Sequence, residues 1–227
     1  MAKKKITRKA LLNEPDEFIT ISSKLLHLAN KHQIQLLYII CAMVLVAIVF
    51  SGYGYFSHKS ESKAFAMLEN SMRDYNISLN KNGHEKALNE VKADFKNIID
   101  KYSGNSGGKT ARLEFANICY NAREIDDAIG LYGKALIDFD KNRFVKCEII
   151  NSLGYAFEEK KDYKSAANYF EKIVSEPDNF LKDEAYFNLG RLFAIMGDEK
   201  KSKEAYKKIC SDFTDSFYFV IAKEHES

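Results

Sequence analysis

The stretch NSLGYAFEEKKDYKSAANYFEKI, residues 151–173, sets Gly154 inside an otherwise helical pattern, with Ala166 twelve residues later and Phe170 four residues further on. Glycine in a helix interior costs about 1 kcal/mol relative to alanine. A glycine inside a periodic segment therefore suggests that a second helix comes close at that point. If the contact belongs to a repeating architecture, the same spacing must recur elsewhere in the chain.

The same spacing recurs in the segments on either side. The following segment is AYFNLGRLFAIMGDEKKSKEAYKKI, residues 185–209, and the preceding one is RLEFANICYNAREIDDAIGLYGKAL, residues 112–136. The copies are 38 and 36 residues apart, which is within the range of helix-turn-helix solenoids. The repeat-signature residues, copy by copy, are Ala116, Ala128 and Tyr132; Gly154, Ala166 and Phe170; and Gly190, Ser202 and Tyr206.

These offsets resemble the tetratricopeptide repeat, which has small residues at its eighth and twentieth positions and an aromatic residue at its twenty-fourth. The resemblance implies two helices per repeat, A and B, with the small residues at their closest approach and the large ones between neighbouring repeats. It predicts repeats over residues 109–142, 147–180 and 183–216. Pro177 follows the second helix B, where it can end that helix.

Apolar residues at helical spacing also fill residues 57–108, which predicts a degenerate leading helix pair. The glycine-rich stretch SGNSGGK, residues 103–109, is expected to be a flexible linker. The apolar stretch SFYFVIA, residues 216–222, is expected to cap the last repeat, because terminal repeats need a cover. The predicted repeat domain is therefore residues 109–227, in an all-α fold.

Residues 34–56, IQLLYIICAMVLVAIVFSGYGYF, contain no Lys, Arg, Asp, Glu or His. At about 1.5 Å per residue this segment is long enough, as a helix, to cross the hydrocarbon core of a bilayer. The pattern predicts a single transmembrane helix that continues into the leading pair, since no proline interrupts it. A cleaved signal peptide is the competing interpretation, but the apolar run is too long for one.

Charge is distributed unevenly about this span. Residues 1–33 hold seven Lys and Arg against three Asp and Glu, whereas residues 57–227 hold 27 against 29. The positive-inside rule then predicts a cytoplasmic N-terminus and an exported repeat domain. Within the basic tail, Phe18, Ile21, Leu25 and Leu28 fall on one face of a helix. They indicate either an amphipathic helix on the inner membrane surface or a short helix that packs on nothing.

The sequence offers little for catalysis. None of its five histidines lies between residues 109 and 216, which excludes imidazole-based nucleophiles and zinc sites from the repeats. Cys119, Cys147 and Cys210 have no metal-ligand spacing and are expected to be buried, reduced thiols. We expect no enzyme activity, cofactor or metal, although a carboxylate- or cysteine-based site stays open. The domain is slightly acidic, so no nucleic-acid binding is expected.

Binding is expected on the concave face, which helix A lines at repeat positions 2, 5, 9 and 12. The mixture of polar and aromatic residues there suits a peptide or a partner helix. The alternative is that these side chains pack between repeats or face water. The predicted protein-binding groove consists of Asn117, Tyr120, Asn151, Tyr155, Glu158, Phe187 and Arg191.

The layout of basic tail, single-pass span and small repeat domain resembles the bacterial inner-membrane tetratricopeptide proteins of the YfgM type, ancillary subunits of the SecYEG translocon. The resemblance implies a non-catalytic periplasmic scaffold that contacts the translocon, a PpiD-type chaperone and exported polypeptides. A cell-envelope assembly adaptor and a regulatory subunit of a membrane-bound enzyme are the alternatives. Self-association also stays open, because Ala47 and Ser51 have a small-xxx-small spacing.

Overall fold

The computed structural model describes residues 17–178 and 180–226, with side chains from residue 23 onward. The cluster of Lys3, Lys4, Lys5, Arg8 and Lys9 in the basic tail lies outside the described residues, as do the side chains of Phe18 and Ile21. All regular secondary structure in the described part is helical. The chain divides into two units, residues 1–58 and 59–227, and each is described by itself.

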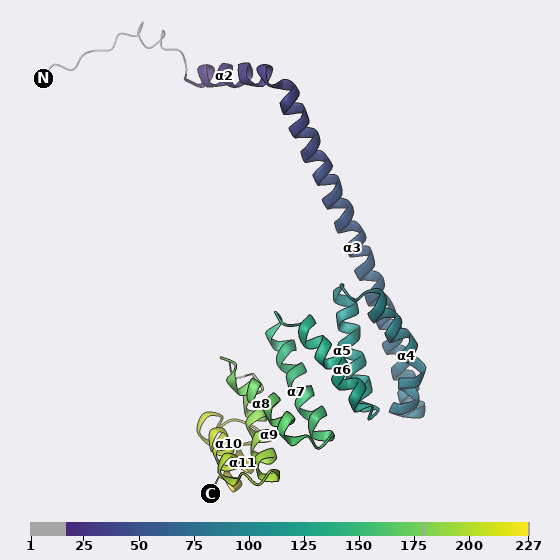
Figure 1. Ribbon diagram of the computed structural model, residues 1–227, viewed down its shortest axis with the longest axis vertical. Coiled ribbons are helices and arrows are strands. Elements are labelled where there is room, and N and C mark those ends of the chain that lie inside the picture. The colour runs from purple at the N-terminus through teal and green to yellow at the C-terminus, as the bar shows by residue number, and fades with distance from the viewer. Residues whose placement is uncertain (1–16, 179, 227) are drawn as a thin grey trace, which may run out of the picture. The chain divides into compact units, whose positions relative to one another are not determined.

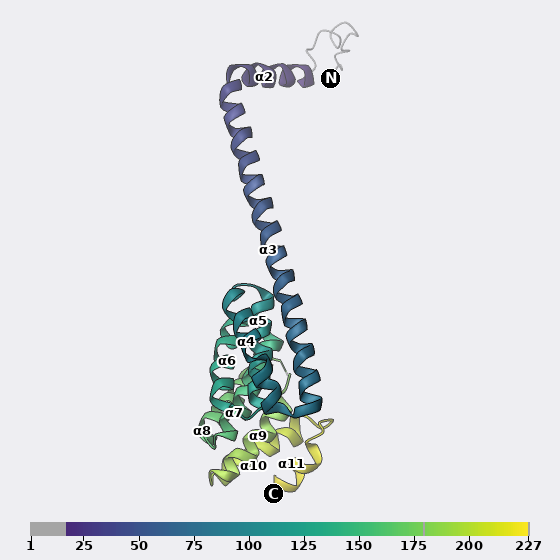
Figure 2. The same ribbon diagram turned by 90° about the vertical axis from the view of Figure 1, so that its right-hand side faces the viewer.

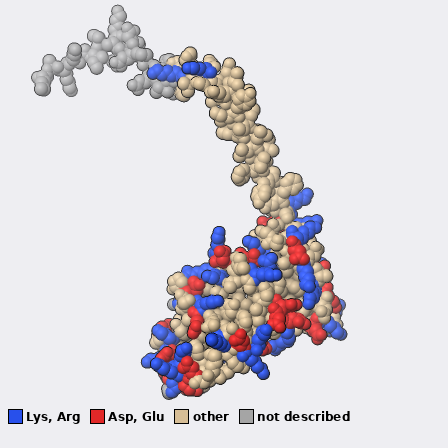
Figure 3. Space-filling model, viewed as in Figure 1, with Lys and Arg blue, Asp and Glu red and all other residues tan. Residues whose placement is uncertain are grey.

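The first unit consists of α2 (Glu17–Lys31) and the first part of α3 (Gln33–Asn82), which are separated at His32. The helix α3 has 50 residues and includes the predicted span, whose side chains are almost all exposed. It is long and apolar enough to cross a membrane. Figure 3 shows this apolar part of α3 without charged side chains.

In the second unit, residues 59–82 of α3 share a core with α4 (His84–Lys101), and further helix pairs follow along the chain (Figures 1 and 2). Each helix packs mainly against its neighbours in sequence, as expected of a solenoid. The predicted all-helical solenoid is confirmed. The remaining helices are α5 (Ser106–Asn121), α6 (Ile125–Asp138), α7 (Arg143–Glu159), α8 (Tyr163–Ser175), α9 (Lys182–Ile195), α10 (Glu199–Asp212) and α11 (Phe219–His225).

The turn from helix A to helix B is built in the same way in all three repeats. The fifteenth residue of each repeat adopts the left-handed conformation, with φ of 66° at Arg123, 60° at Lys161 and 78° at Gly197. In the second repeat the next residue, Asp162, donates its N–H to the carbonyl of Phe157. The Asp162 side chain then caps α8 by accepting from the Ser165 N–H at 3.1 Å. This turn thus has a definite hydrogen-bond pattern.

The expected linker at 103–109 is wrong in its second half, because α5 begins at Ser106 and both Gly107 and Gly108 are buried. The physical reason is a close helix contact. A Cβ placed on Gly107 would lie 2.7 Å from the Cβ of Ala64 in α3. Asn105 adds a hydrogen bond of 3.0 Å from its Nδ2 to Ser60 Oγ. Gly107 therefore allows α5 to pack against α3, whereas a Cβ on Gly108 would overlap the carbonyl of Tyr102 at the end of α4.

Candidate functional site

Within each repeat, helices A and B meet at the signature residues. Gly154 of α7 lies under the ring of Phe170, where an added Cβ would be 2.6 Å from Phe170 Cζ. Gly190 has the same relation to Tyr206, also at 2.6 Å, and Ser202 Oγ donates to the Gly190 carbonyl at 2.8 Å. This contact fixes how α7 and α9 present their other face, the one that carries repeat positions 2, 5, 9 and 12. We call it the A-helix face.

Two hollows open on the A-helix face. The first, the tyrosine hollow, has a volume of about 350 Å³ and lies between α5, α6 and α7. The hydroxyl of Tyr132 donates to Asn117 Oδ1 at 2.7 Å and so holds that amide in place. Burial raises the pKa of Tyr120, so this hydroxyl stays neutral. The tyrosine hollow is lined by Asn117, Tyr120, Asn121, Tyr132, Ser152 and Tyr155.

The second hollow, of about 390 Å³, shares Tyr120 and Tyr155 with the first, so the two adjoin. We call it the ion-pair hollow. Arg191 of α9 donates to both carboxylate oxygens of Glu158 in α7, at 2.8 and 2.9 Å. This bidentate hydrogen bond raises the pKa of Arg191. The ion-pair hollow is lined by Tyr120, Tyr155, Glu158, Glu159, Lys161, Tyr163, Arg191 and Ile195.

A chain of hydrogen bonds connects α7 to α9 beside these hollows. Arg191 Nη2 donates to Asn188 Oδ1 at 2.9 Å, and Asn188 Nδ2 donates to the Tyr155 hydroxyl at 2.9 Å. Tyr155 in turn donates to Glu184 Oε1 at 2.6 Å, and Asn151 Nδ2 donates to the same oxygen at 3.1 Å. Burial, followed by the hydrogen bond to Glu184, raises the pKa of Tyr155. Tyr155 is therefore a neutral donor within a connected network.

The structure separates the seven predicted groove residues. Asn117 and Tyr120 line the tyrosine hollow, and Asn151, Tyr155, Glu158 and Arg191 take part in the network between α7 and α9. Phe187 lines neither hollow, because its ring stacks on Tyr218 with centroids 4.6 Å apart.

The expected lining positions include Glu184, but the seven predicted groove residues name neither Glu184 nor Asn188. Glu184 occupies repeat position 2, and Asn188 follows it by one helical turn on the same side of α9. That spacing is the signal that could have identified both residues. The hydrogen bonds that both residues form with Tyr155 cannot be inferred from this spacing, because Tyr155 belongs to another repeat.

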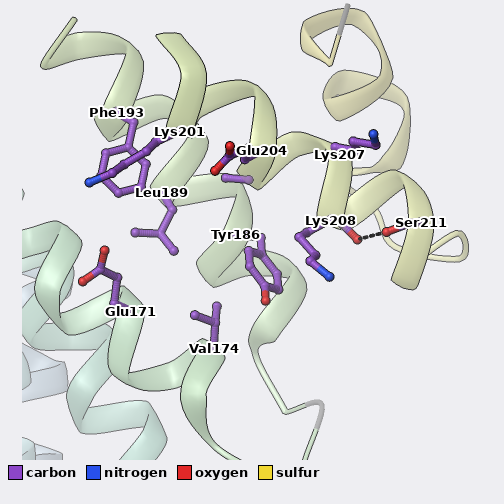
Figure 4. Close-up of a pocket in the computed structure, with 11 residues that line it drawn as sticks. Glu171, Val174, Tyr186, Leu189, Phe193, Lys201, Glu204, Lys207, Lys208 and Ser211 are labelled. Atoms are coloured by element: carbon purple, nitrogen blue, oxygen red, sulfur yellow. Dashed lines mark hydrogen bonds between the residues drawn. The ribbon is translucent and has the colours of Figure 1, made fainter. Parts of the chain in front are cut away.

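A further cleft, of about 550 Å³, lies on other sides of the helices, between α8, α9 and α10. Figure 4 shows Val174, Leu189, Tyr186 and Phe193 around it, with Lys201 extended along the Phe193 ring. The Lys201 ammonium lies 5.1 Å from the centre of that ring. Most of the exposed lining is apolar. The sequence pattern predicts no site here, because the large residues at these positions are expected to pack between neighbouring repeats.

The two buried thiols in the described part of the chain are poorly suited to nucleophilic chemistry. Cys119 and Cys147 are buried, and burial raises the pKa of Cys119 to about 11 and that of Cys147 above its ordinary value. Thiols with raised pKa values are poor nucleophiles near neutral pH. Among the residues that the structure describes, no group of three or more His, Cys, Asp and Glu side chains could hold a metal ion.

Comparison with known sequences supports the repeat assignment. The tetratricopeptide repeat family model matches residues 148–178 and 183–211. The human intraflagellar transport protein 88 homolog is 28% identical over 127 residues, which make up 54% of this chain and 15% of that protein. The chain thus spans about one seventh of the length of this relative.

Solved structures share the fold. A crystal structure of nearly identical TPR-like repeats, from a Podosopora anserina protein described as a kinesin light chain, covers 73% of this chain and 84% of its own at 10% identity, with a TM-score of 0.53. BtubC from P. vanneervenii covers 70% and 74% at 13% identity, with a TM-score of 0.50. The family model thus identifies tetratricopeptide repeats at residues 148–178 and 183–211, and the solved structures show that the chain has a TPR-like solenoid fold.

Proposed function

We propose that the protein is a non-catalytic, membrane-anchored scaffold that binds a polypeptide segment on the A-helix face of its repeats. The observation that carries the proposal is the pair of adjoining hollows, which share Tyr120 and Tyr155 on consecutive A helices. Aromatic side chains with polar tips supply contact area and hydrogen bonds with little loss of conformational freedom. A continuous row of such residues suits an extended peptide or a partner helix.

For the location we propose a bacterial inner membrane, with residues 34–56 crossing it once, the N-terminus in the cytoplasm and the repeats in the periplasm. The apolar part of α3 and the basic excess of residues 1–33 support this arrangement. The partners proposed are the SecYEG translocon, a PpiD-type chaperone and exported polypeptides, on the basis of the family resemblance.

The test is photocrosslinking in cells from a probe that replaces Asn121. This residue is exposed and lines the tyrosine hollow, so the probe leaves the hydrogen-bond network intact. The matched control replaces Lys164, which is exposed on α8. The proposal predicts an adduct from position 121 that is absent from position 164.

The identity of the captured protein separates the finer alternatives. Translocon subunits, a chaperone or exported chains would support the export role, whereas envelope-assembly proteins would support the adaptor role. An adduct from position 164 without one from position 121 would show that the A-helix face is not the binding surface.

A further inference from the structure

The acidic side chains of the A-helix face fall into two classes. Glu158 is neutralised by Arg191, and Glu159 by Arg123 at 2.7 Å. In the described part of the chain, no Lys, Arg or His lies within ion-pair distance of Glu148 or Glu184. Both are at repeat position 2, in consecutive repeats. This part of the face therefore carries negative charge without a cation beside it.

Glu184 is also where the hydrogen-bond chain ends. Starting from Arg191, each bond along Asn188 and Tyr155 donates toward Glu184 Oε1. Such a chain polarises its members and ends with a donor directed at the Glu184 carboxylate. The second oxygen, Oε2, accepts no hydrogen bond from the described side chains or backbone. The Glu184 carboxylate, which lies beside the two hollows, therefore has one oxygen available to accept a hydrogen bond from a ligand.

Asn151 supplies an independent indication. Its side chain points at Glu184, only 9% of the residue is exposed, and its Oδ1 is buried without a donor in the described structure. Leaving a buried acceptor unpaired is unfavourable, so native structures seldom do so without a reason. Because Asn151 Nδ2 already donates to Glu184, this amide lies directly beside the carboxylate.

We propose that the A-helix face binds a polypeptide segment that presents a lysine or arginine, with its cationic group on the Glu184 carboxylate beside the Asn151 amide. This deepens the proposed function and rests on it. An ammonium has three donors and a guanidinium five, and both form charge-assisted hydrogen bonds to a carboxylate. The ring of Tyr155 next to Glu184 gives the aliphatic stem of the side chain an apolar surface. Segments rich in Asp and Glu are repelled by Glu148 and Glu184.

The first test measures the binding of two synthetic peptides to the full chain in detergent, by fluorescence anisotropy. The peptides have equal length and differ only in carrying lysines or glutamates at the same positions. We expect the lysine peptide to bind at least about tenfold more tightly, the equivalent of one charge-assisted hydrogen bond. The Glu184→Gln variant should lose most of this preference, because Gln keeps an acceptor for Tyr155 but removes the charge.

Two further variants complete the test. Glu171→Gln makes the same charge change on exposed α8 and should bind both peptides as the unmodified chain does. Glu148→Gln alters an exposed side chain, cannot disturb the network and should weaken lysine-peptide binding by a smaller factor. Equal affinity for the two peptides would overturn the inference, as would equal behaviour of Glu184→Gln and Glu171→Gln.

The cellular experiment distinguishes failure of this inference from failure of the proposed function. The Asn121 probe is repeated in the Glu184→Gln background, and the crosslinked segment of the partner is sequenced. Undiminished capture of a segment without Lys or Arg overturns the inference and leaves the scaffold function intact. Reduced capture of a Lys- or Arg-bearing segment supports the inference, and absence of capture from position 121 in both backgrounds overturns the inference and the proposed function together.

Discussion

Single side chains decide how closely the helices of a repeat can approach, and Gly154 is the clearest case. The ring of Phe170 occupies the space that a side chain at position 154 would need, and Phe170 is itself fully buried against Tyr155. The first repeat has Ala116 at the equivalent position, so one methyl group is tolerated there opposite Tyr132. The limit is therefore set by volume.

A larger residue at position 154 should destabilise the second repeat. We expect Gly154→Val to lower the free energy of unfolding by about 1–3 kcal/mol, since the added atoms push Phe170 out of a packed position. Urea unfolding of the full chain in detergent, followed by circular dichroism, measures the change. Gly133→Val is the matched control, because nothing lies within 4 Å of Gly133 in α6. Equal loss in both variants would contradict the packing argument.

The ion pair between Arg112 and Asp138 joins α5 to α6, with side chains only 11% and 15% exposed. Asp138→Asn leaves the guanidinium covered and without its counter-charge. Breaking a buried pair in this way costs about 3–5 kcal/mol, and the partial exposure favours the lower end of that range. The matched control, Glu204→Gln, removes an exposed pair with Lys200 and should change stability by less than about 1 kcal/mol. Comparison of the two urea midpoints checks the expectation.

At the scale of elements, the C-terminal part of α3 acts as helix A of the leading pair. Ala64, Leu68 and Tyr75 of α3 are buried in the same core cluster as α4 and α5. Tyr75 also makes a hydrogen bond of 3.0 Å to His84 Nδ1 across the turn. The start of α5 completes this packing, although a glycine-rich stretch at that point is typical of a linker.

Alanine scanning of the glycines tests this packing. Gly107→Ala should destabilise the full chain by about 1–3 kcal/mol, because its methyl group would meet Ala64 and the backbone of Phe65. Gly104→Ala should leave stability nearly unchanged, since nothing lies within 4 Å of Gly104. Hydrogen exchange should report faster opening of residues 59–82 in the first variant alone. Equal stability and equal hydrogen exchange in the two variants would contradict the packing of Gly107 against α3.

At the scale of the whole molecule, two units of different character are joined in one chain. Residues 34–56 are apolar and exposed, whereas in the repeat unit basic and acidic side chains are interspersed over the surface (Figure 3). An exposed apolar surface of this length is unfavourable in water. A surrounding lipid phase removes that cost, which is the physical basis for proposing a membrane anchor.

The anchor has a direct test. The unmodified chain should stay in the membrane fraction after alkaline carbonate extraction. Val44→Arg combined with Ala47→Arg should release much of it, because each arginine near the centre of a span costs about 2.5–3.5 kcal/mol for insertion. The control places the same two arginines at Ser62 and Phe65, beyond the predicted span. Release of the unmodified chain by carbonate would refute a transmembrane anchor.

The sequence by itself determined the all-helical class, the register of the three repeats and the position of the apolar helix. These features follow from local residue spacing, because residues three or four apart lie on the same face of a helix. The pattern also identified which face of the repeats carries Asn117, Tyr120 and Tyr155.

Only the tertiary structure decided which of these side chains already have partners within the chain. Glu158 pairs with Arg191, 33 residues away, and Tyr155 with Glu184, 29 residues away. Stacking brings positions 12 and 9 of one helix A beside positions 9 and 2 of the next. The ring of Phe187 contacts Tyr218 and lines neither hollow. Gly107 lies in α5 against Ala64, where the sequence pattern predicted a linker. Such pairings depend on how whole repeats stack, a geometry that local spacing does not encode.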